Sequence, residues 1–190
     1  MKYEAVVIGA SLGGMEALRV ILAALPQNFP VPILIVQHLS SRPDSFLAKY
    51  LNDLCQIGVK EADEKEKIIS GNAYLAPPNY HLMIEQDGCL ALSVDEKVNY
   101  SRPSIDVLFE SAAYAYDEKL IGIILTGSNA DGAIGLKCIK ERGGLTIVQE
   151  PRTAEASSMP NAAIKTSKVD YVLPLCDIGQ LLNHLVGRRK

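Results

Sequence analysis

The chain has 190 residues, of which 48% are hydrophobic and 22% charged, which is the composition of a folded globular protein and not of a disordered one. Its formal net charge of −3 provides no basic field that would call for nucleic acid or an anionic membrane as a partner. No apolar run approaches the roughly 20 residues of a membrane span, and the N-terminus lacks the layout of a signal peptide.

The cysteines also exclude some classes of protein. The four of them are scattered without a CxxC pair, so neither a zinc site nor a disulfide framework is indicated. The length suits one folding unit with a substantial core. We therefore expect a single cytoplasmic domain over residues 1–190, with no metal and no cofactor.

A glycine-rich turn follows the first expected strand. Ala5–Ile8 is a continuous apolar run, typical of a strand that is buried on both faces. Gly9-Ala10-Ser11-Leu12-Gly13-Gly14 comes next, and an amphipathic helical pattern begins at Met15. This order predicts Ser11 at the carboxyl edge of a parallel sheet, where ligands and catalytic groups collect. The turn fits the G-x-S-x-G nucleophile pattern, but a phosphate-binding turn and a purely structural turn are alternatives.

Strands and helices alternate along the rest of the chain. Apolar runs predict strands at 31–36, 57–60, 73–75, 120–125, 145–149 and 171–173. Helices are expected from 43 to about 54, from 103 or 104 to 113, over 133–142, late in 151–166 and around 178–185. Asp87-Gly88 indicates a β-hairpin over 80–94. The alternation predicts a doubly wound, three-layer α/β/α fold with a mostly parallel sheet and a small hairpin excursion.

Three strand-end loops carry the residue types of an acyl-transfer site. Ser11 follows the first strand, His38 follows the second, and Asp131 lies after the strand at 120–125. A hydroxyl, an imidazole and a carboxylate that fixes the imidazole tautomer together make a nucleophilic triad. Each residue has a plainer interpretation: a structural serine, a packing histidine, and the N-cap of the helix at 133. Their common edge favours catalysis.

The second strand weakens the phosphate-binding alternative. A dinucleotide site expects an acidic residue about 20 or more positions after the glycine turn, where it holds the ribose. Gln37 and His38 occupy that place. A hydrolase is therefore the preferred interpretation.

Several motifs in order make the chain similar to a known family. They are Ile8–Gly14, Val36–His38, Ala76–Leu82, Arg102–Phe109, Leu125–Gly127, Asp131–Leu136 and Met159-Pro160. Over essentially its whole length the chain resembles the catalytic domain of the chemotaxis protein-glutamate methylesterases (CheB-type). The resemblance implies a triad of Ser11, His38 and Asp131. It also implies hydrolysis of glutamate γ-methyl esters on the cytoplasmic helices of methyl-accepting chemotaxis receptors, which releases methanol, with deamidation of receptor glutamines as an additional activity.

Further residues around the nucleophile are candidate oxyanion or substrate contacts. The backbone N–H groups of Leu12 and Gly13 begin the first helix, where they suit an oxyanion. Ser128 and Asn129 stand where the family usually has methionine and then glycine, and the shorter, polar Ser128 is expected to widen and wet that wall. Met159 is a candidate at the same site.

Other positions have open interpretations. Glu155-Ala156 stand where the family commonly has a Thr-Ser pair. His81 is expected to pack or hydrogen-bond near the cleft, and Asp106 to be an acid in the first turn of a helix, with a supporting role left open. Tyr100 and Arg102 either line a receptor groove or anchor their loop.

The resemblance also raises the question of regulation. Many family members carry an N-terminal phospho-receiver domain that covers the active site until it is phosphorylated. Here the first strand begins at about Tyr3, so we expect a free-standing enzyme that is open constitutively or regulated by a partner in trans. Two other functions stay open: a serine esterase with the same triad and another substrate, or a catalytically idle module that binds receptors or nucleotides.

Overall fold

The computed structural model describes residues 2–38 and 46–187, and in these ranges the main sheet has seven strands. Its order is β3-β4-β2-β1-β7-β8-β9, and every neighbouring pair is parallel. The strands are β1 (Ala5–Ala10), β2 (Ile33–Gln37), β3 (Gly58–Glu61), β4 (Asn72–Leu75), β7 (Leu120–Ile124), β8 (Leu145–Gln149) and β9 (Tyr171–Leu173). No helix within these ranges is long and apolar enough to cross a membrane.

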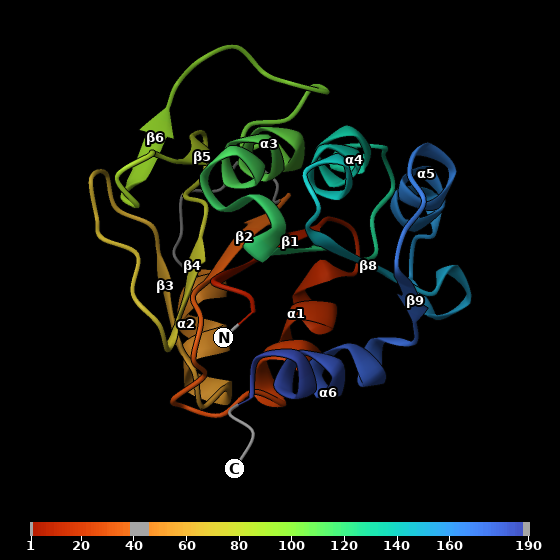
Figure 1. The fold of residues 1–190 in the computed structure, drawn as a ribbon, viewed down its shortest axis with the longest axis horizontal. Helices are drawn as coiled ribbons and strands as arrows, with labels where there is room; N and C mark the ends of the chain where they lie inside the picture. Colours follow the sequence, from red (N-terminus) through yellow and green to blue (C-terminus); the bar gives the residue numbers. More distant parts are fainter. Residues whose placement is uncertain (1, 39–45, 188–190) are drawn as a thin grey trace.

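Helices cover both faces of the sheet (Figure 1). One face packs against α1 (Gly14–Ala23), α2 (Phe46–Leu54) and α6 (Leu175–Val186), and the other against α3 (Ile105–Tyr116), α4 (Ala133–Glu141) and α5 (Ser158–Thr166). Val6 and Ile8 of β1 share a buried cluster with Leu18 of α1, whereas Val7 shares the opposite cluster with Leu108 of α3. Because alternate side chains of a strand point to opposite faces, a strand covered on both sides is apolar throughout.

The middle of the chain forms a separate two-stranded hairpin. β5 (His81–Ile84) and β6 (Leu90–Ser93) pair antiparallel across the turn that holds Asp87 and Gly88. Leu82 and Leu90 join the buried cluster that contains Leu108 of α3. The hairpin therefore extends the α3 layer (Figure 1).

The expected three-layer fold with its parallel sheet and hairpin is confirmed. Some boundaries differ. β2 begins at Ile33 and not at 31, because Pro32 has no N–H to donate to a strand ladder. α6 begins at Leu175, directly after its N-cap residue Pro174, which has no N–H that would need a partner at the helix start. The expected start of the helix at 43 lies outside the described residues.

The strand order explains why one edge of the sheet attracts a site. From β1 the chain moves to β2 on one side, and it later returns to β7 on the other side. In open α/β sheets, ligands bind where the connections diverge in this way, outside the carboxyl ends of the strands. Ser11 after β1, His38 after β2 and Thr126 after β7 lie together at that point, since the Ser11 N–H donates to the Thr126 carbonyl and the His38 N–H to the Ala10 carbonyl.

Candidate active site

Ser11 begins a tight turn between β1 and α1. Its carbonyl accepts the Gly14 N–H at 2.8 Å, and Gly13 has φ 79° and ψ −2°, the third-position values of a type II turn, which favour glycine. The Ser11 N–H donates to the Thr126 carbonyl at 2.9 Å, and the Gln37 side-chain amide donates to the Ser11 carbonyl at 2.7 Å. The turn is therefore tied to the ends of both neighbouring strands.

His38 lies beside Ser11 because of the strand register. Ala10 pairs with Gln37, so the next residue of each strand, Ser11 and His38, comes out at the same level. The His38 N–H donates to the Ala10 carbonyl at 3.0 Å, which continues the ladder by one residue. The base and the nucleophile predicted from the sequence are thus neighbours across β1 and β2.

His38 and Asp131 form a hydrogen-bonded pair. The distance from His38 Nε2 to Asp131 Oδ2 is 2.9 Å, and the side chains are 12% and 0% exposed, respectively. Since Asp131 holds Nε2, the nitrogen left to act as a base is Nδ1. Among the described residues no hydrogen bond joins the Ser11 hydroxyl to His38. The side-chain nitrogen of Asn129 instead lies 3.4 Å from Nδ1.

The Asp131 carboxylate also receives donors from the start of α3 and from the loop before it. The Ile105 N–H donates to it at 2.7 Å, the Ser104 hydroxyl at 2.8 Å and the Asn99 amide at 2.9 Å. Burial opposes ionisation, but these hydrogen bonds and the one from His38 outweigh burial and lower the pKa of Asp131. Asp131 is therefore a fixed anion at the N-terminus of α3. The alternative that it caps α4 is wrong, because the N-cap of α4 is Gly132.

Asp106 of α3 contacts α4, just as Asp131, which precedes α4, contacts the start of α3. It belongs to the first turn of α3, and its Oδ1 accepts the Gly135 N–H of α4 at 2.7 Å. Its Oδ2 accepts the Asn99 amide at 2.8 Å, so Asn99 bridges the two carboxyl groups. Burial raises the pKa of Asp106 to about 6, with the nearby charge of Asp131 adding to the effect and the Gly135 N–H partly offsetting it.

Asn99 and Ser104 are the site contacts that sequence reasoning missed. Ser104 stands just before a helix, a position that suggests a cap for that helix, yet its hydroxyl donates to Asp131. Asn99 lies 32 positions from Asp131 in a loop, and no local pattern marks it. His81 packs as expected: its Nδ1 accepts the Ser104 N–H at 3.2 Å, and its Nε2 lies 3.0 Å from the Glu96 carbonyl.

Two loops brace the nucleophile turn from behind. The Thr126 hydroxyl donates to the Leu12 carbonyl at 2.8 Å, and the Gly127 N–H donates to the Ala156 carbonyl at 2.9 Å. A Cβ placed on Gly127 would lie 2.6 Å from Met159 Cε and 3.0 Å from Ser11 Cβ, so these side chains flank Gly127. Met159 is fully buried and supports the turn from the protein interior.

The outer side of the turn is open. Leu12 is 54% exposed, and within the described residues the N–H groups of Leu12 and Gly13 make no hydrogen bond. Ser128 is exposed, and Asn129 is half-buried. A Cβ on Gly13 would lie 2.7 Å from a carboxylate oxygen of Glu155, so Glu155 lies against the same turn. The arrangement leaves backbone donors beside the serine for an incoming oxyanion.

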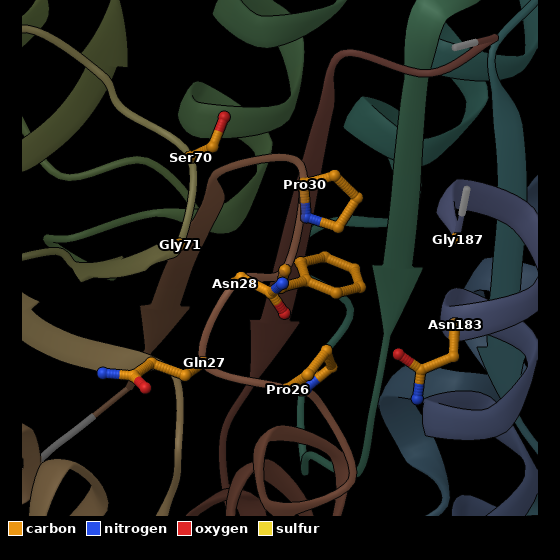
Figure 2. Close-up of a pocket in the computed structure, with 9 residues that line it drawn as sticks. Pro26, Gln27, Asn28, Pro30, Ser70, Gly71, Asn183 and Gly187 are labelled. Carbon is orange, nitrogen blue, oxygen red and sulfur yellow. The ribbon is translucent and has the colours of Figure 1, made fainter. Parts of the chain in front are cut away.

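The structure has pockets at opposite ends of the strands. A small one of about 130 Å³ opens beside His38, between Lys97, Tyr100 and Arg102. A larger one of about 660 Å³ lies near the residues that precede β2 and β4, with Asn183 of α6 on its other side (Figure 2). Its lining contains none of the predicted site residues. The small pocket is the one that adjoins the candidate chemistry.

The sequence profile of the CheB methylesterase family matches residues 6–182. The chain belongs to this family. A Leptospira interrogans protein, provisionally named protein-glutamate methylesterase/protein-glutamine glutaminase, is 56% identical over 185 residues, which cover 97% of this chain and 96% of that protein. A Carboxydothermus hydrogenoformans protein, named protein-glutamate methylesterase/protein-glutamine glutaminase 1, is 44% identical over 182 residues, which cover 93% of this chain and 54% of that protein.

A solved CheB structure has the same fold. The crystal structure of the Thermotoga maritima CheB methylesterase catalytic domain aligns with a TM-score of 0.93 at 37% identity, covering 97% of this chain and 99% of that one. The family resemblance drawn from the motifs is confirmed, and so is the enzyme class, a protein-glutamate methylesterase. The catalytic roles of Ser11, His38 and Asp131 stay predictions.

Proposed function

We propose that this CheB methylesterase hydrolyses glutamate γ-methyl esters on methyl-accepting chemotaxis receptors in the cytoplasm and releases methanol. The names of the L. interrogans and C. hydrogenoformans relatives support this activity, and they support glutamine deamidation as a second one. The observation that carries the proposal is the 2.9 Å pair of His38 and Asp131 beside Ser11, at the carboxyl edge of the sheet.

The proposed mechanism is acyl transfer through a serine ester. Ser11 Oγ attacks the ester carbonyl carbon while its proton passes to Nδ1 of His38. The Asp131 carboxylate stabilises the imidazolium through Nε2–H. The N–H groups of Leu12 and Gly13 receive the oxyanion. His38 then returns the proton to the departing methoxide, and a water molecule repeats the sequence on the acyl-enzyme. With a glutamine substrate, ammonia leaves in place of methanol.

The shape of the site suits the end of a side chain presented by a protein. The pocket beside His38 measures about 130 Å³, and its rim carries Tyr100, which is 97% exposed. A glutamyl ester on a receptor helix can place its reactive group there while the helix itself stays on the surface. Methylated receptors are therefore the proposed protein partner, and a regulator in trans would have to cover this same edge.

Replacement of the nucleophile tests the proposal. Ser11→Ala is expected to lower methanol release from methylated receptor membranes by several orders of magnitude, because the proposed acyl-enzyme forms on the Ser11 hydroxyl. Ser70→Ala is the matched control, since Ser70 is exposed and lies at the remote pocket. Circular dichroism melting would verify that both variants fold. Methanol release at the wild-type rate from Ser11→Ala would refute the mechanism.

A serine esterase with another substrate is the second candidate, favoured by the polar pair Ser128 and Asn129: Ser128 is exposed, and Asn129 lies 3.4 Å from His38 Nδ1. It predicts that a fluorophosphonate labels Ser11 and that small esters are hydrolysed, while methylated receptor is left intact. A catalytically idle module would instead show no labelling of Ser11. Methanol release from methylated receptor, fluorophosphonate labelling of Ser11 and hydrolysis of small esters together separate the candidates.

A further inference from the structure

Asn129 contacts Nδ1 of His38, the nitrogen that acts as the base in the proposed mechanism. Its Nδ2 lies 3.4 Å from His38 Nδ1, a long hydrogen bond, while Asp131 holds Nε2 at 2.9 Å. Among the described residues, Asn129 is the side chain that makes a hydrogen bond to Nδ1. The nitrogen that would accept the proton of Ser11 is thus already paired in this structure.

The second hydrogen bond of Asn129 sets the orientation of its amide. Asn129 Oδ1 accepts the Asp131 N–H at 3.2 Å, which leaves the NH₂ group for His38. An amide nitrogen can only donate, so this contact requires a lone pair on Nδ1 and places the imidazole proton on Nε2. The Asp131 carboxylate accepts at Nε2. Asn129 and Asp131 therefore select the same tautomer from opposite ring nitrogens.

We propose that Asn129 is a positioning residue that caps Nδ1 of His38 in the resting enzyme and yields it to Ser11 when substrate binds. The inference rests on the proposed triad and goes beyond it. The cap presets the tautomer that the first proton transfer requires. It also competes with the serine hydroxyl for one lone pair, and it must turn away once Nδ1 is protonated, because two N–H groups would then face each other.

Other charged groups surround His38, and the Asn129 variants leave them in place. Asp131 contacts Nε2, and Lys97 and Arg102 line the adjoining pocket together with Tyr100. Asp106 lies one step further away, joined to Asp131 by the Asn99 bridge. A difference between variants at position 129 therefore reports on the amide and not on this background.

Two substitutions remove the amide donor of Asn129: Asn129→Ala removes the acceptor for the Asp131 N–H as well, whereas Asn129→Asp keeps it. Asn129→Ala removes the cap, and we expect a fluorophosphonate to label Ser11 several-fold faster, up to about tenfold, the range for one net hydrogen bond. Asn129→Asp keeps an oxygen for the Asp131 N–H but places an anion against Nδ1, which favours the protonated ring. We expect the acid limb of its labelling profile to move to higher pH, with slower labelling at neutral pH.

The ring itself provides a readout that needs no substrate. In ¹⁵N NMR spectra of the wild-type protein, His38 is expected in the Nε2–H tautomer with a hydrogen-bonded Nδ1. In Asn129→Ala the Nδ1 signal should move toward that of an uncapped imine nitrogen. Asn28→Ala and Asn28→Asp are the matched controls, because Asn28 is exposed at the remote pocket. Neither should change the labelling or the spectrum of His38.

Three results would overturn the inference: labelling of folded Asn129→Ala at or below the wild-type rate, profiles that move alike in the two Asn129 variants, or an unchanged Nδ1 signal in Asn129→Ala. A wild-type protein that fluorophosphonate does not label at all would count against the proposed function alone. The NMR comparison would then decide whether Asn129 caps His38.

Discussion

Asp131 and Asp106 are buried carboxyl groups at two adjacent helix starts, yet their pKa values move in opposite directions. Burial opposes the charge of both. Asp131 is compensated by His38, Asn99, Ser104 and the first N–H groups of α3, whereas Asp106 receives fewer donors and faces the charge of Asp131. The donor set around each carboxyl group, more than its burial, decides which one stays ionised.

This difference predicts a pH dependence of stability. The pKa of Asp106 is about 6 in the folded chain against an ordinary 3.8, so the stability that it contributes is complete below about pH 4 and is lost as the pH rises through 6. We expect Asp106→Asn to remove this decline, which for one proton has a slope of at most about 1.4 kcal/mol per pH unit. Urea unfolding at pH values from 4 to 7 would measure it.

The exposed Asp53 of α2 provides the control for that titration. Asp53→Asn should leave the pH dependence of the unfolding free energy unchanged. If the unfolding free energy of Asp106→Asn falls with pH as steeply as that of the wild-type chain between pH 4 and 6, burial does not raise the pKa of Asp106 and the prediction is wrong.

At the scale of single residues, the sequence predicts the position of side chains that follow strands. Ser11, His38 and Asp131 could be placed at one edge because each comes directly after, or soon after, an apolar run. Asn99 could not be placed, since its contact with Asp131 spans 32 positions through a loop without a periodic pattern. The hydrogen bond of Asn129 to His38 depends on side-chain geometry, which residue spacing does not encode.

The contact between α3 and α4 depends on one position without a side chain. A Cβ on Gly135 would lie 2.6 Å from Phe109 Cβ and 3.1 Å from the Asp106 Cα and carbonyl oxygen. Two of these neighbours are backbone atoms, so the helices must move apart to admit a methyl group. That movement would also stretch the 2.7 Å hydrogen bond from the Gly135 N–H to Asp106.

We therefore expect Gly135→Ala to lower the free energy of unfolding by about 1–3 kcal/mol, the usual cost of overpacking, even though alanine is the better helix former. Ile134→Ala, at an exposed neighbouring position of α4, should change it by less than about 0.5 kcal/mol. Urea denaturation of both variants makes the comparison. An equal or higher stability of Gly135→Ala would show that α3 and α4 can separate freely.

Elements were predicted where one periodic pattern dominates. Uninterrupted apolar runs predict the central strands, and these runs are apolar throughout because helices cover both faces of the sheet. The observed start of an element differs from the predicted one where a proline precedes it, at Pro32 before β2 and at Pro174 before α6. The crossed contacts, Asp131 with the start of α3 and Asp106 with α4, could not be predicted, because Asp131 also suits a cap of α4 and Asp106 a place in the first turn of α3.

For the whole molecule, the sheet separates two buried clusters, one under α1, α2 and α6 and the other under α3, α4 and α5. If residues 1–190 are one domain, as the length suggests, both clusters should unfold together. Leu18→Ala and Leu108→Ala, one in each cluster, are each expected to cost about 2–5 kcal/mol and to shift one common transition.

Scanning calorimetry tests that cooperativity. Both variants should keep the calorimetric enthalpy equal to the van't Hoff enthalpy. Leu54→Ala, at an exposed position at the end of α2, should leave the midpoint nearly unchanged. Two separate transitions, each moved by only one of the core substitutions, would mean that the two faces fold as separate units.

The order of the strands was beyond sequence reasoning. β1 pairs with β7, a strand far along the chain, and apolar runs carry no information about which strands become neighbours. The alternation of elements indicates the layers, and the family motifs support them, but neither predicts the register that places Ser11 opposite His38.

The small volume of the pocket beside His38 has a consequence for the inhibition of this enzyme. At about 130 Å³ it falls below the roughly 300–1,000 Å³ of cavities that enclose drug-sized compounds. A compound confined to this space can bring only a few heavy atoms into contact with the protein, and the number of those atoms limits the affinity that it can reach. Strong inhibition would require a warhead that bonds to the serine, or a peptide mimic that extends across the surrounding surface.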